Sequence, residues 1–309
     1  MTKQRHEISS LRALTKSFFA LFSFLFLSLF LSDEISAATL EGLNLALNLI
    51  VPTAFPFMVL ADTARHTFEF EKSNFFSTAF ERIFKINRCG ISAFLAGATG
   101  GFPIGAKIAL EQYKDGKISK SECERLASFT NIASPAYTVY AVGIGMLSSF
   151  KLGLTLYFVS LISAIVSGAL LGINKHISPY TEFKSKQSFN AVDSIKSAAT
   201  ASINLIFFIS FFSAICRLIK KLGLPKLLEA IMISFSEVGN STRHLSELYI
   251  FPFRLSVALI SFSLSFSGLS VIMQSLALDG TNSISKRKFI SYKLLQGTVS
   301  FLIIIALPI

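Results

Sequence analysis

Long apolar segments separated by short polar or basic stretches make up most of the chain. A helix needs about 20 apolar residues to cross a bilayer. The segments long enough to do so are residues 126–147, 152–173, 198–219 and 289–309. Residues 43–61 are also apolar and contain Pro52 and Pro56, which kink a helix but are tolerated in a packed membrane bundle. The pattern predicts an all-α polytopic membrane protein.

The N-terminal apolar segment, residues 17–32, has two interpretations. Basic residues precede it and Asp33-Glu34 follows it, which suits a first membrane helix with its N-terminus inside. A signal peptide is the alternative, because Ser36-Ala37-Ala38 offers small residues for cleavage. We therefore predict that residues 1–40 form an N-terminal membrane helix or a signal-like segment. Both interpretations place residue 35 outside.

Residues 74–87 have the spacing of an amphipathic helix. Phenylalanine and isoleucine recur on one face, while Glu81, Arg82 and Lys85 lie on the other. The pattern predicts a helix that lies in the membrane interface. A soluble cytoplasmic helix packed on a neighbouring element is the alternative.

Two apolar regions are too short to cross uninterrupted. The first, residues 91–110, is broken at Thr99–Pro103, and the second, residues 255–278, is broken at Ser267-Gly268. Their lengths predict two re-entrant or broken-helix hairpins. Paired breaks in the two halves of a membrane protein point to the substrate site of a transporter.

A short internal match relates the two halves. Ile118-Ser119-Lys120 recurs as Ile284-Ser285-Lys286, and the numbering offset between these stretches also places Gly101-Phe102 on Ser267-Gly268. An odd number of crossings per half then predicts an inverted repeat. The predicted units are residues 41–173, a cytoplasmic linker at residues 174–196, and residues 197–309. The positive-inside rule opposes this topology, because the basic residues around Lys220 and the cluster Lys286–Lys288 would lie outside.

Composition supports a membrane-embedded chain and narrows its partners. Of 309 residues, 52% are hydrophobic and 15% are charged; the net charge is +11 and the mean hydropathy +0.60. An ordinary soluble domain carries about 25% charged residues. The basic residues lie between apolar segments, which indicates cytoplasmic loops rather than a nucleic-acid footprint. We therefore expect contact with the lipid bilayer and no nucleic-acid partner. Cys89, Cys123 and Cys216 are scattered, so we expect no disulfide framework, metal site or cofactor.

The first break carries candidate binding residues. Its members are Thr99, Gly100, Gly101, Pro103, Gly105 and Lys107. Glycine lets the backbone approach a ligand closely, and proline suits the first turn of a half-helix that starts at Ile104. The free N–H groups of such a start favour an anion or a carbonyl oxygen. A lysine at membrane depth costs about 2.5–3.5 kcal/mol and usually faces a cavity or a partner. Snorkelling to the interface is the alternative for Lys107.

Further candidates lie in the second half and in the segment at residues 126–147. They are Asn131, Ser134, Glu237, Asn240, Ser267, Gly268, Ser270 and Gln274. Glu237 can bind a cation, pair with Lys107 or contact the substrate, and a solvated loop carboxylate is the alternative. For Gln274 the alternative is a hydrogen bond between helices, and for the Asn131–Ser134 break it is a packing kink. No HExxH, GxSxG or complete phosphate-loop motif occurs, and we expect a protein that is not an enzyme.

Several of these motifs resemble one known family. The stretches GGFPIGAK at Gly100–Lys107, ISK at Ile118–Lys120 and NIASP at Asn131–Pro135 resemble the YlbJ family of sporulation integral membrane proteins, grouped with the nucleoside-recognition (Gate) domain proteins. FSGLSV at Phe266–Val271 is similar to that family's FGGLSV stretch, whereas EVGNS at Glu237–Ser241 departs from its EVTNG. The resemblance covers about residues 40–309. It implies two Gate-like repeats in a membrane protein of spore-forming bacteria, in the cell or forespore membrane, associated with movement of dipicolinic acid.

These observations leave three hypotheses for function. The first is a transporter or channel-like carrier for an aromatic dicarboxylate such as dipicolinic acid, held by Lys107 and the half-helix at Ile104. The second is a nucleoside-type transporter that uses Asn131, Gln274 and Glu237. The third is a membrane scaffold or assembly factor for spore formation that transports nothing. A homo-oligomer or a partner membrane subunit is compatible with each.

Overall fold

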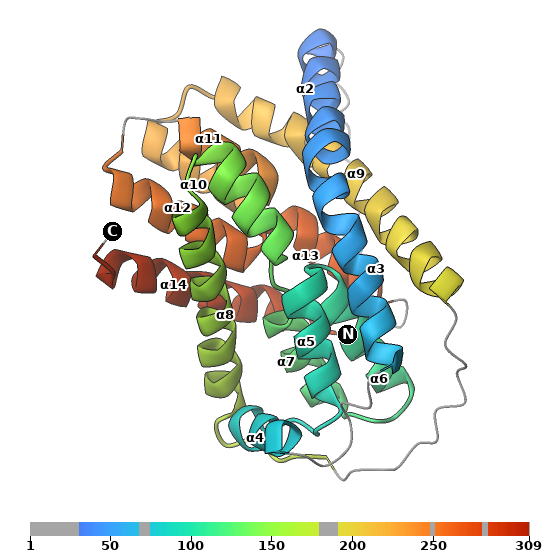
Figure 1. The fold of residues 1–309 in the computed structure, drawn as a ribbon. Coiled ribbons are helices and arrows are strands. Elements are labelled where there is room, and N and C mark those ends of the chain that lie inside the picture. The colour runs from blue at the N-terminus through green and yellow to red at the C-terminus, as the bar shows by residue number, and fades with distance from the viewer. Residues whose placement is uncertain (1–30, 68–74, 179–190, 248–250, 280–283, 309) are drawn as a thin grey trace, which may run out of the picture.

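The computed structural model describes residues 31–67, 75–178, 191–247, 251–279 and 284–308. All regular structure in these ranges is helical (Figure 1). The segments that are long and apolar enough to cross a membrane are Ser32–Thr63, Phe150–Gly172, Ala191–Lys221, Phe253–Ala277 and Lys286–Ala306. The predicted all-α polytopic membrane protein is thereby confirmed. The predicted N-terminal segment at residues 17–32 lies almost wholly outside the described residues.

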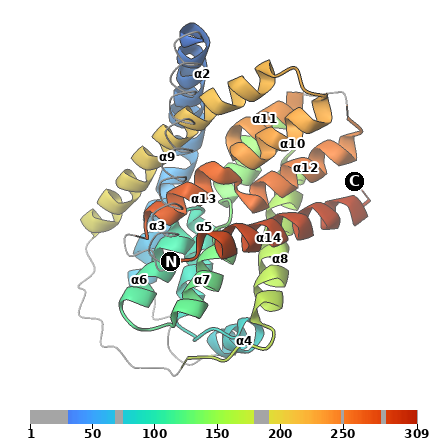
Figure 2. The same ribbon diagram turned by 180° about the vertical axis from the view of Figure 1, so that it is seen from behind.

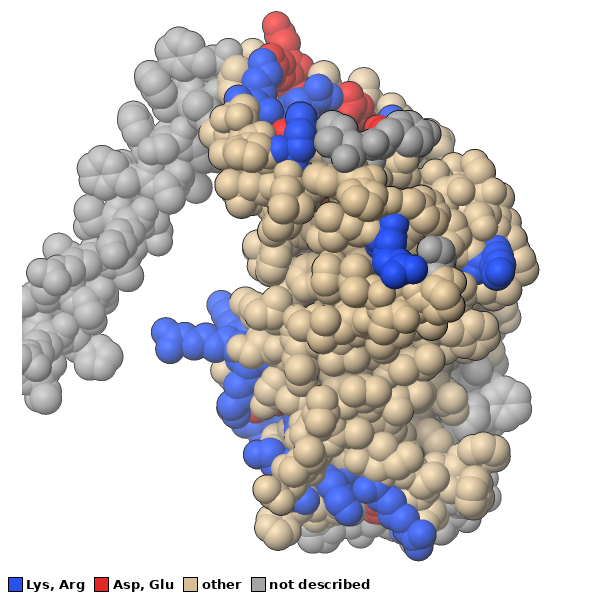
Figure 3. Space-filling model, turned by 90° about the vertical axis from the view of Figure 1, so that its left-hand side faces the viewer, with Lys and Arg blue, Asp and Glu red and all other residues tan. Residues whose placement is uncertain are grey.

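The surface carries the apolar belt that a bilayer requires. Figure 3 shows lysine and arginine side chains at the top, along the lower left edge and in two patches near mid-height, with extensive uncharged surface around them. Large apolar side chains face outward from the crossing helices, including Phe158 at 56% exposed, Phe207 at 66% and Leu302 at 57%. Such exposure is stable in lipid, where the backbone is satisfied within each helix. The chain is therefore an integral, multi-pass membrane protein.

The first crossing helix runs through α2 (Ser32–Leu45), η1 (Ala46–Ile50) and α3 (Val51–Thr67). It packs along α9 (Ala191–Lys221) in the opposite direction. Two ion pairs fix this antiparallel register: Arg217 Nη2 lies 2.6 Å from Glu41 Oε1, and Lys221 pairs with Glu34. The predicted boundary between residues 40 and 41 falls within α2.

Two hairpins enter the molecule from opposite ends. The first consists of α5 (Gly90–Gly100) and α6 (Ile104–Lys114), and the second of α10 (Lys226–Ser236) and α11 (Val238–Glu247). Within each hairpin the two helices pack against each other. The first hairpin is the one predicted at residues 91–110, and its second helix begins at Ile104 as expected. The second hairpin turns at Glu237, where the sequence indicated only a break after an apolar segment.

Two further segments are discontinuous helices. The first is α7 (Lys120–Phe129) followed by η2 (Ala136–Met146), and the second is α12 (Phe253–Phe266) followed by α13 (Gly268–Ala277). The segment at residues 126–147 is interrupted at Asn131–Ser134 as the sequence indicated, because the chain leaves the helix between residues 130 and 135. The region 255–278 is broken as predicted, but α13 continues roughly in line with α12 and does not fold back as a hairpin (Figures 1 and 2).

Helix boundaries recur along the chain with one offset. Adding 136 to the bounds of α5, 90–100, gives those of α10, 226–236. The same addition carries Phe150, the start of α8 (Phe150–Gly172), onto Lys286, the start of α14 (Lys286–Ala306). We call this relationship the hairpin register. In it the turn at Gly101 corresponds to Glu237, and the α7–η2 break corresponds to Ser267.

The alignment of the two halves predicted from the sequence is wrong, because the structure places the matched stretches at the same end of the molecule. It matched the stretch that begins at Ile118 with the stretch that begins at Ile284 as elements of an inverted repeat. An inverted repeat requires the two stretches to lie at opposite ends of the molecule. Glu124 contacts Lys288 at 2.7 Å, which places them at the same end.

The conflict with the positive-inside rule is reduced by the same contact. Ser178, which follows α8, donates its backbone N–H to Glu122 Oε1 at 3.2 Å. Glu122 lies in the same helical turn as Glu124, the partner of Lys288. The cluster Lys286–Lys288 therefore lies at the end of the molecule where the 174–196 linker begins. Arg217 and Lys221 do lie at the opposite end, where acidic side chains of α2 neutralise them.

The amphipathic segment forms α4 (Phe75–Phe84). Its buried face carries Phe80 and Phe84, and Phe84 stacks on Phe129 with ring centroids 4.9 Å apart. Phe75 and Phe76 on the other side are exposed. The helix thus packs on the bundle through one face and presents aromatic rings outward through another; its placement in the interface stays a prediction.

Candidate functional site

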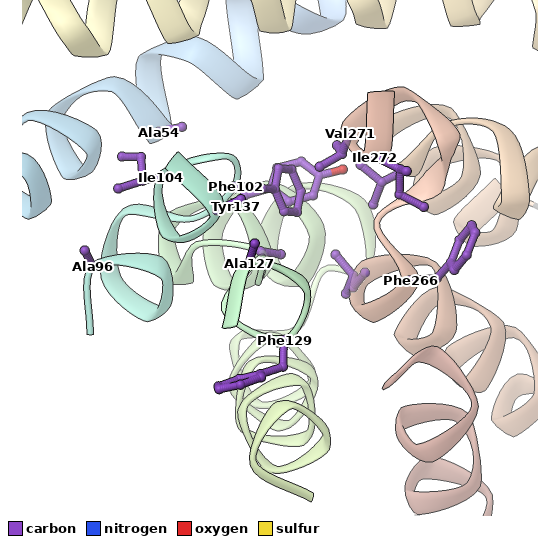
Figure 4. Close-up of a cluster of buried hydrophobic side chains, with 14 of the residues drawn as sticks. Ala54, Ala96, Phe102, Ile104, Ala127, Phe129, Tyr137, Phe266, Val271 and Ile272 are labelled. Carbon is purple, nitrogen blue, oxygen red and sulfur yellow. The ribbon is translucent and has the colours of Figure 1, made fainter. Parts of the chain in front are cut away.

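The ends of four broken or hairpin elements surround one central cavity. It has a volume of about 20 Å³, which is room for about one water molecule. Its lining residues are Gly100, Gly101 and Phe102 from the first hairpin, Ser134 and Tyr137 from the α7–η2 region, Glu237 and Val238 from the second hairpin, Val271 and Gln274 from α13, Ile50, Ala54 and Met58 from η1 and α3, and Leu205 and Ile209 from α9. Figure 4 shows Phe102 and Tyr137 at the centre of this arrangement, with Val271 nearby.

Close backbone approach holds the first hairpin against the α7–η2 break. Gly101 has φ +81°, and a Cβ added there would lie 2.7 Å from Ser134 Cβ. Only glycine satisfies both the conformation and the space at this turn. Gly105 has a packing role of the same kind, because a Cβ there would lie 2.4 Å from the Thr130 carbonyl oxygen. The hairpin therefore closes around the C-terminal end of α7.

The second break is held in a similar way. Gly268 has φ +66°, and a Cβ there would lie 3.1 Å from both Glu237 Cα and the Ser236 carbonyl oxygen. Ser267 adopts φ +76°, and its Oγ donates to the Asn131 carbonyl oxygen at 3.4 Å. The two discontinuous helices thus meet at their breaks, and the second hairpin packs on one of them.

Glu237 is the charged group of the central cavity. Its side chain is fully buried, and its oxygens accept hydrogen bonds from Gly239 N at 2.8 Å, Asn240 N at 2.5 Å and Asn240 Nδ2 at 2.8 Å. These donors lie at the start of α11, where the helix dipole favours a carboxylate. Among the described residues Glu237 forms no ion pair, so the pairing with Lys107 considered from the sequence does not occur; Lys107 lies 3.8 Å from Glu111 instead.

Gln274 presents an amide without internal partners. The residue is 3% exposed, yet neither Oε1 nor Nε2 forms a hydrogen bond to any described residue. A buried amide with no partner loses about 1–3 kcal/mol per group. Gln274 lines both the central cavity and a larger one beside it. Within the described ranges, the hydrogen bond between helices that was the alternative for Gln274 is absent.

Two larger cavities flank the central one. The linker-side cavity, about 360 Å³, includes Asp62, Pro103, Lys107, Asn204 and Gln274 in its lining. The opposite cavity, about 380 Å³, is lined by Leu45, Leu49, Gly145, Met146, Arg243, Ser246 and Glu247.

The three cavities lie one after another along the continuous helix formed by α2, η1 and α3. Leu45 and Leu49 line the opposite cavity, Ile50 and Ala54 the central one, and Met58 both the central and the linker-side cavities. At a rise of 1.5 Å per residue, the distance along the helix from Leu45 to Asp62 is about 25 Å. That distance approaches the thickness of a bilayer's hydrocarbon core.

The predicted site residues fall into two groups. Those that line a cavity are Gly100, Gly101, Pro103, Lys107, Ser134, Glu237 and Gln274. Those that support the breaks without lining a cavity are Gly105, Asn131, Asn240, Ser267 and Gly268. Ser270 is buried beside the second break, and its hydroxyl has no hydrogen-bond partner among the described residues. Thr99 is exposed, and its hydroxyl donates to the Leu95 carbonyl of its own helix at 2.9 Å. Ligand binding by any of them stays a prediction.

Lys293 is a residue that the sequence reasoning missed. It lies in α14 and is fully buried, and its Nζ donates to the Asn131 carbonyl oxygen at 2.7 Å and to Gln296 Oε1 at 2.9 Å. The signal was present, because an ionisable residue within an apolar crossing segment indicates a functional site by default. The length and apolarity of residues 289–309 indicate a crossing helix, and that pattern alone gives the lysine no role.

Comparison with known proteins finds a similar protein in a spore-forming bacterium. The chain is 23% identical over 318 residues to the sporulation integral membrane protein YlbJ of Bacillus subtilis (strain 168), an alignment that covers 87% of this chain and 76% of that protein. The resemblance to a YlbJ-like family is therefore confirmed, at a large evolutionary distance. No protein-family model matches the chain. No solved structure matches it.

Proposed function

We propose that the protein is a membrane transporter or channel-like carrier for a small organic solute, and that it acts in sporulation as its relative's name indicates. The observation that carries the proposal is Gln274, a buried amide without partners among the described residues, at the junction of two cavities. Transporters bind solutes near the midplane at the interface formed by discontinuous helices, and Gln274 lies in one such helix, α13.

In this proposal the solute passes through the central cavity and the two larger cavities that flank it. Large openings at both ends narrow to about 20 Å³ at the centre, so this conformation is closed to anything larger than water. One part of the central wall comes from hairpins and broken helices, and the rest comes from the continuous helices η1–α3 and α9. The hairpins and broken helices can move relative to the rest without breaking a continuous helix. A carrier of this design would open the centre to one end at a time.

For the solute, we propose an aromatic dicarboxylate such as dipicolinic acid. Lys107 supports this choice, because it lines the linker-side cavity and is 28% exposed, and because its one ion pair among the described residues is a 3.8 Å contact with Glu111. The Lys107 ammonium also contacts Ser197 at the start of α9. An incoming carboxylate would gain a charge-assisted hydrogen bond there. An aromatic ring would then pack against the apolar centre near Met58 and Phe102.

A nucleoside is the second candidate, favoured by the chemistry of the central cavity. Glu237 is an acceptor for ribose hydroxyls, and Gln274 offers both a donor and an acceptor to a base edge. The carboxylate would repel a dicarboxylate that reached the centre. A spore-formation scaffold that moves no solute remains the alternative outside the transport class.

Flux through reconstituted vesicles tests the proposal. Liposomes containing the native chain would be loaded with radiolabelled dipicolinate or uridine, and efflux compared with protein-free liposomes. We expect dipicolinate flux that falls at least tenfold in Gln274→Leu, which removes both polar atoms at similar volume. Met273→Leu is the matched control, since Met273 is 48% exposed on the same helix. Uridine flux alone would select the nucleoside candidate, and no flux of either solute would favour the scaffold.

A further inference from the structure

Hydrogen bonds around the Lys293 side chain join three elements at the centre of the bundle. From α14 it donates to the carbonyl of Asn131, in the break after α7, and to Gln296 of its own helix. The same Asn131 carbonyl accepts the Ser267 hydroxyl from the break before α13. Among the described residues Lys293 forms no ion pair with a carboxylate.

A buried lysine without an acid requires another source of negative potential. Removing an ammonium from water costs several kcal/mol unless it is compensated. Asn131 lies directly after the C-cap of α7, Thr130, and the last carbonyls of a helix carry its negative dipole end. Two carbonyl-type oxygens at 2.7 and 2.9 Å therefore form a cation site that the protein itself fills.

In transporters with broken helices, the unwound carbonyls and half-helix C-termini are where a coupling sodium ion or proton binds. We propose that the Lys293 ammonium is a resident cation in the α7–η2 break, which takes the place of a bound metal ion. The site then needs no sodium for its structure. The inference also concerns energy coupling, and in this part it rests on the proposed function. Solute movement does not depend on a sodium gradient.

The first half offers an internal comparison. In the hairpin register Lys293 corresponds to Tyr157 in α8, whose hydroxyl donates to the Ala98 carbonyl at 3.0 Å, near the end of α5. The same position in each half therefore contacts the C-terminal end of a helix that leads into a break, although the two helices, α5 and α7, are not counterparts in the hairpin register. Only the second half uses a charged group for this contact, so the cation is specific to the α7–η2 break.

Thermal unfolding of the purified full chain tests the cation site without any transported solute. Lys293→Ala should lower Tm by on the order of several degrees, and propylammonium or sodium chloride should restore part of the loss, whereas choline chloride of equal concentration should not. Lys293→Met, which keeps the length but removes the charge, should also lower Tm, and no salt should restore it. Lys151→Ala removes an exposed lysine of α8 and should respond to none of these salts.

Two results would overturn the inference. One is a Lys293→Met variant with the native Tm, which would show that the break needs no cation. The other is a destabilised Lys293→Ala variant that no small cation restores, which would leave the lysine as packing alone. In vesicles, replacing sodium by choline should leave native flux unchanged, and a dependence on sodium would refute the coupling statement. Absence of any flux together with cation rescue of Lys293→Ala would preserve the cation site and reject transport.

Discussion

Lys107 and Arg243 occupy equivalent positions in the two hairpins. Each is followed one turn later by a glutamate, and the two ion pairs, Lys107–Glu111 at 3.8 Å and Arg243–Glu247 at 3.0 Å, are related by the hairpin register. Lys107 lines the linker-side cavity and Arg243 the opposite one. Each mouth of the proposed route therefore carries one cation, held by a partner that is itself partly exposed.

This relationship predicts that removing either charge impairs solute entry from one side of the membrane only. Lys107→Gln should raise the KM for dipicolinate entry from the linker side, and Arg243→Gln the KM for entry from the opposite side, each by several-fold, because a mouth cation mainly raises the local anion concentration. Initial rates in vesicles with one orientation of the protein would measure both. Lys151→Gln is the control. Equal effects of both variants from both sides would contradict separate mouths.

The turn at Gly101 predicts a stability difference between two glycine substitutions. Gly101→Ala places a Cβ at positive φ and 2.7 Å from Ser134, whereas Gly223→Ala places one at φ +62° with nothing within 4 Å. Gly223→Ala should lose about 1 kcal/mol to the positive φ, and Gly101→Ala about 1–3 kcal/mol, because φ +81° with ψ −176° is a region essentially confined to glycine. Gly101→Ala should lose about 1–3 kcal/mol more to overpacking. Comparable Tm values for the two variants would show that the hairpin tip does not press on the α7–η2 break.

Glu237 predicts opposite outcomes for the two candidate solutes. Glu237→Gln removes the negative charge while keeping one oxygen for the donors at the start of α11. Dipicolinate flux should rise, because a repulsive charge leaves the central cavity. Uridine flux should fall by about tenfold or more, because a hydrogen bond to a charged acceptor is worth about 1.5–3 kcal/mol. Tm would be measured in parallel, so that a misfolded variant is recognised.

Glu122 predicts a pH dependence of stability at the linker end, outside the helices that cross the bilayer. Burial raises the pKa of Glu122, but hydrogen bonds from Ser178, Ser119 and the Asn87 backbone outweigh it and hold that pKa below its ordinary value. A lowered folded-state pKa means that the stabilisation is present above the unfolded value, about 4.3, and is lost as pH falls through the folded value.

Thermal unfolding between about pH 5 and pH 3 checks this expectation. Native Tm should fall across that range, and Glu122→Gln should start lower and fall less steeply. Glu247→Gln removes an exposed carboxylate, 64% exposed, and should keep the native slope. Parallel slopes for the native chain and Glu122→Gln would contradict the assignment.

Much of the fold follows from local sequence because length and apolarity decide whether a helix can cross. The helices at residues 150–172 and 286–306 agree with the predicted segments to within a few residues for that reason, and the helix at 191–221 extends further at its N-terminal end. The sequence also predicts a break at Thr99–Pro103, and the structure has it at residues 101–103, since glycine and proline specify a turn locally. The second hairpin was not, because Glu237 and the helix after it have the composition of a surface loop.

The site required information that no local pattern holds. The hairpin register depends on which helices pack together. The short match between the stretches at Ile118 and Ile284 aligns the two halves differently and therefore misleads. Gln274 and Lys107 were identified as polar residues at depth, but which of them shares a cavity with Glu237 depends on packing across both halves. Lys293 can be recognised in the sequence as a lysine within an apolar segment. Its partner cannot be, because Asn131 lies 162 residues away.

The helix formed by α2, η1 and α3 borders all three cavities, so a tilt of this helix would change both outer cavities at once. Tilting it about Ala54 would move Leu45 and Asp62 in opposite directions, which widens one mouth as the other narrows. This one helix would thereby couple the opening of one end to the closing of the other. Cysteines introduced along this helix would change reactivity in opposite senses above and below the pivot.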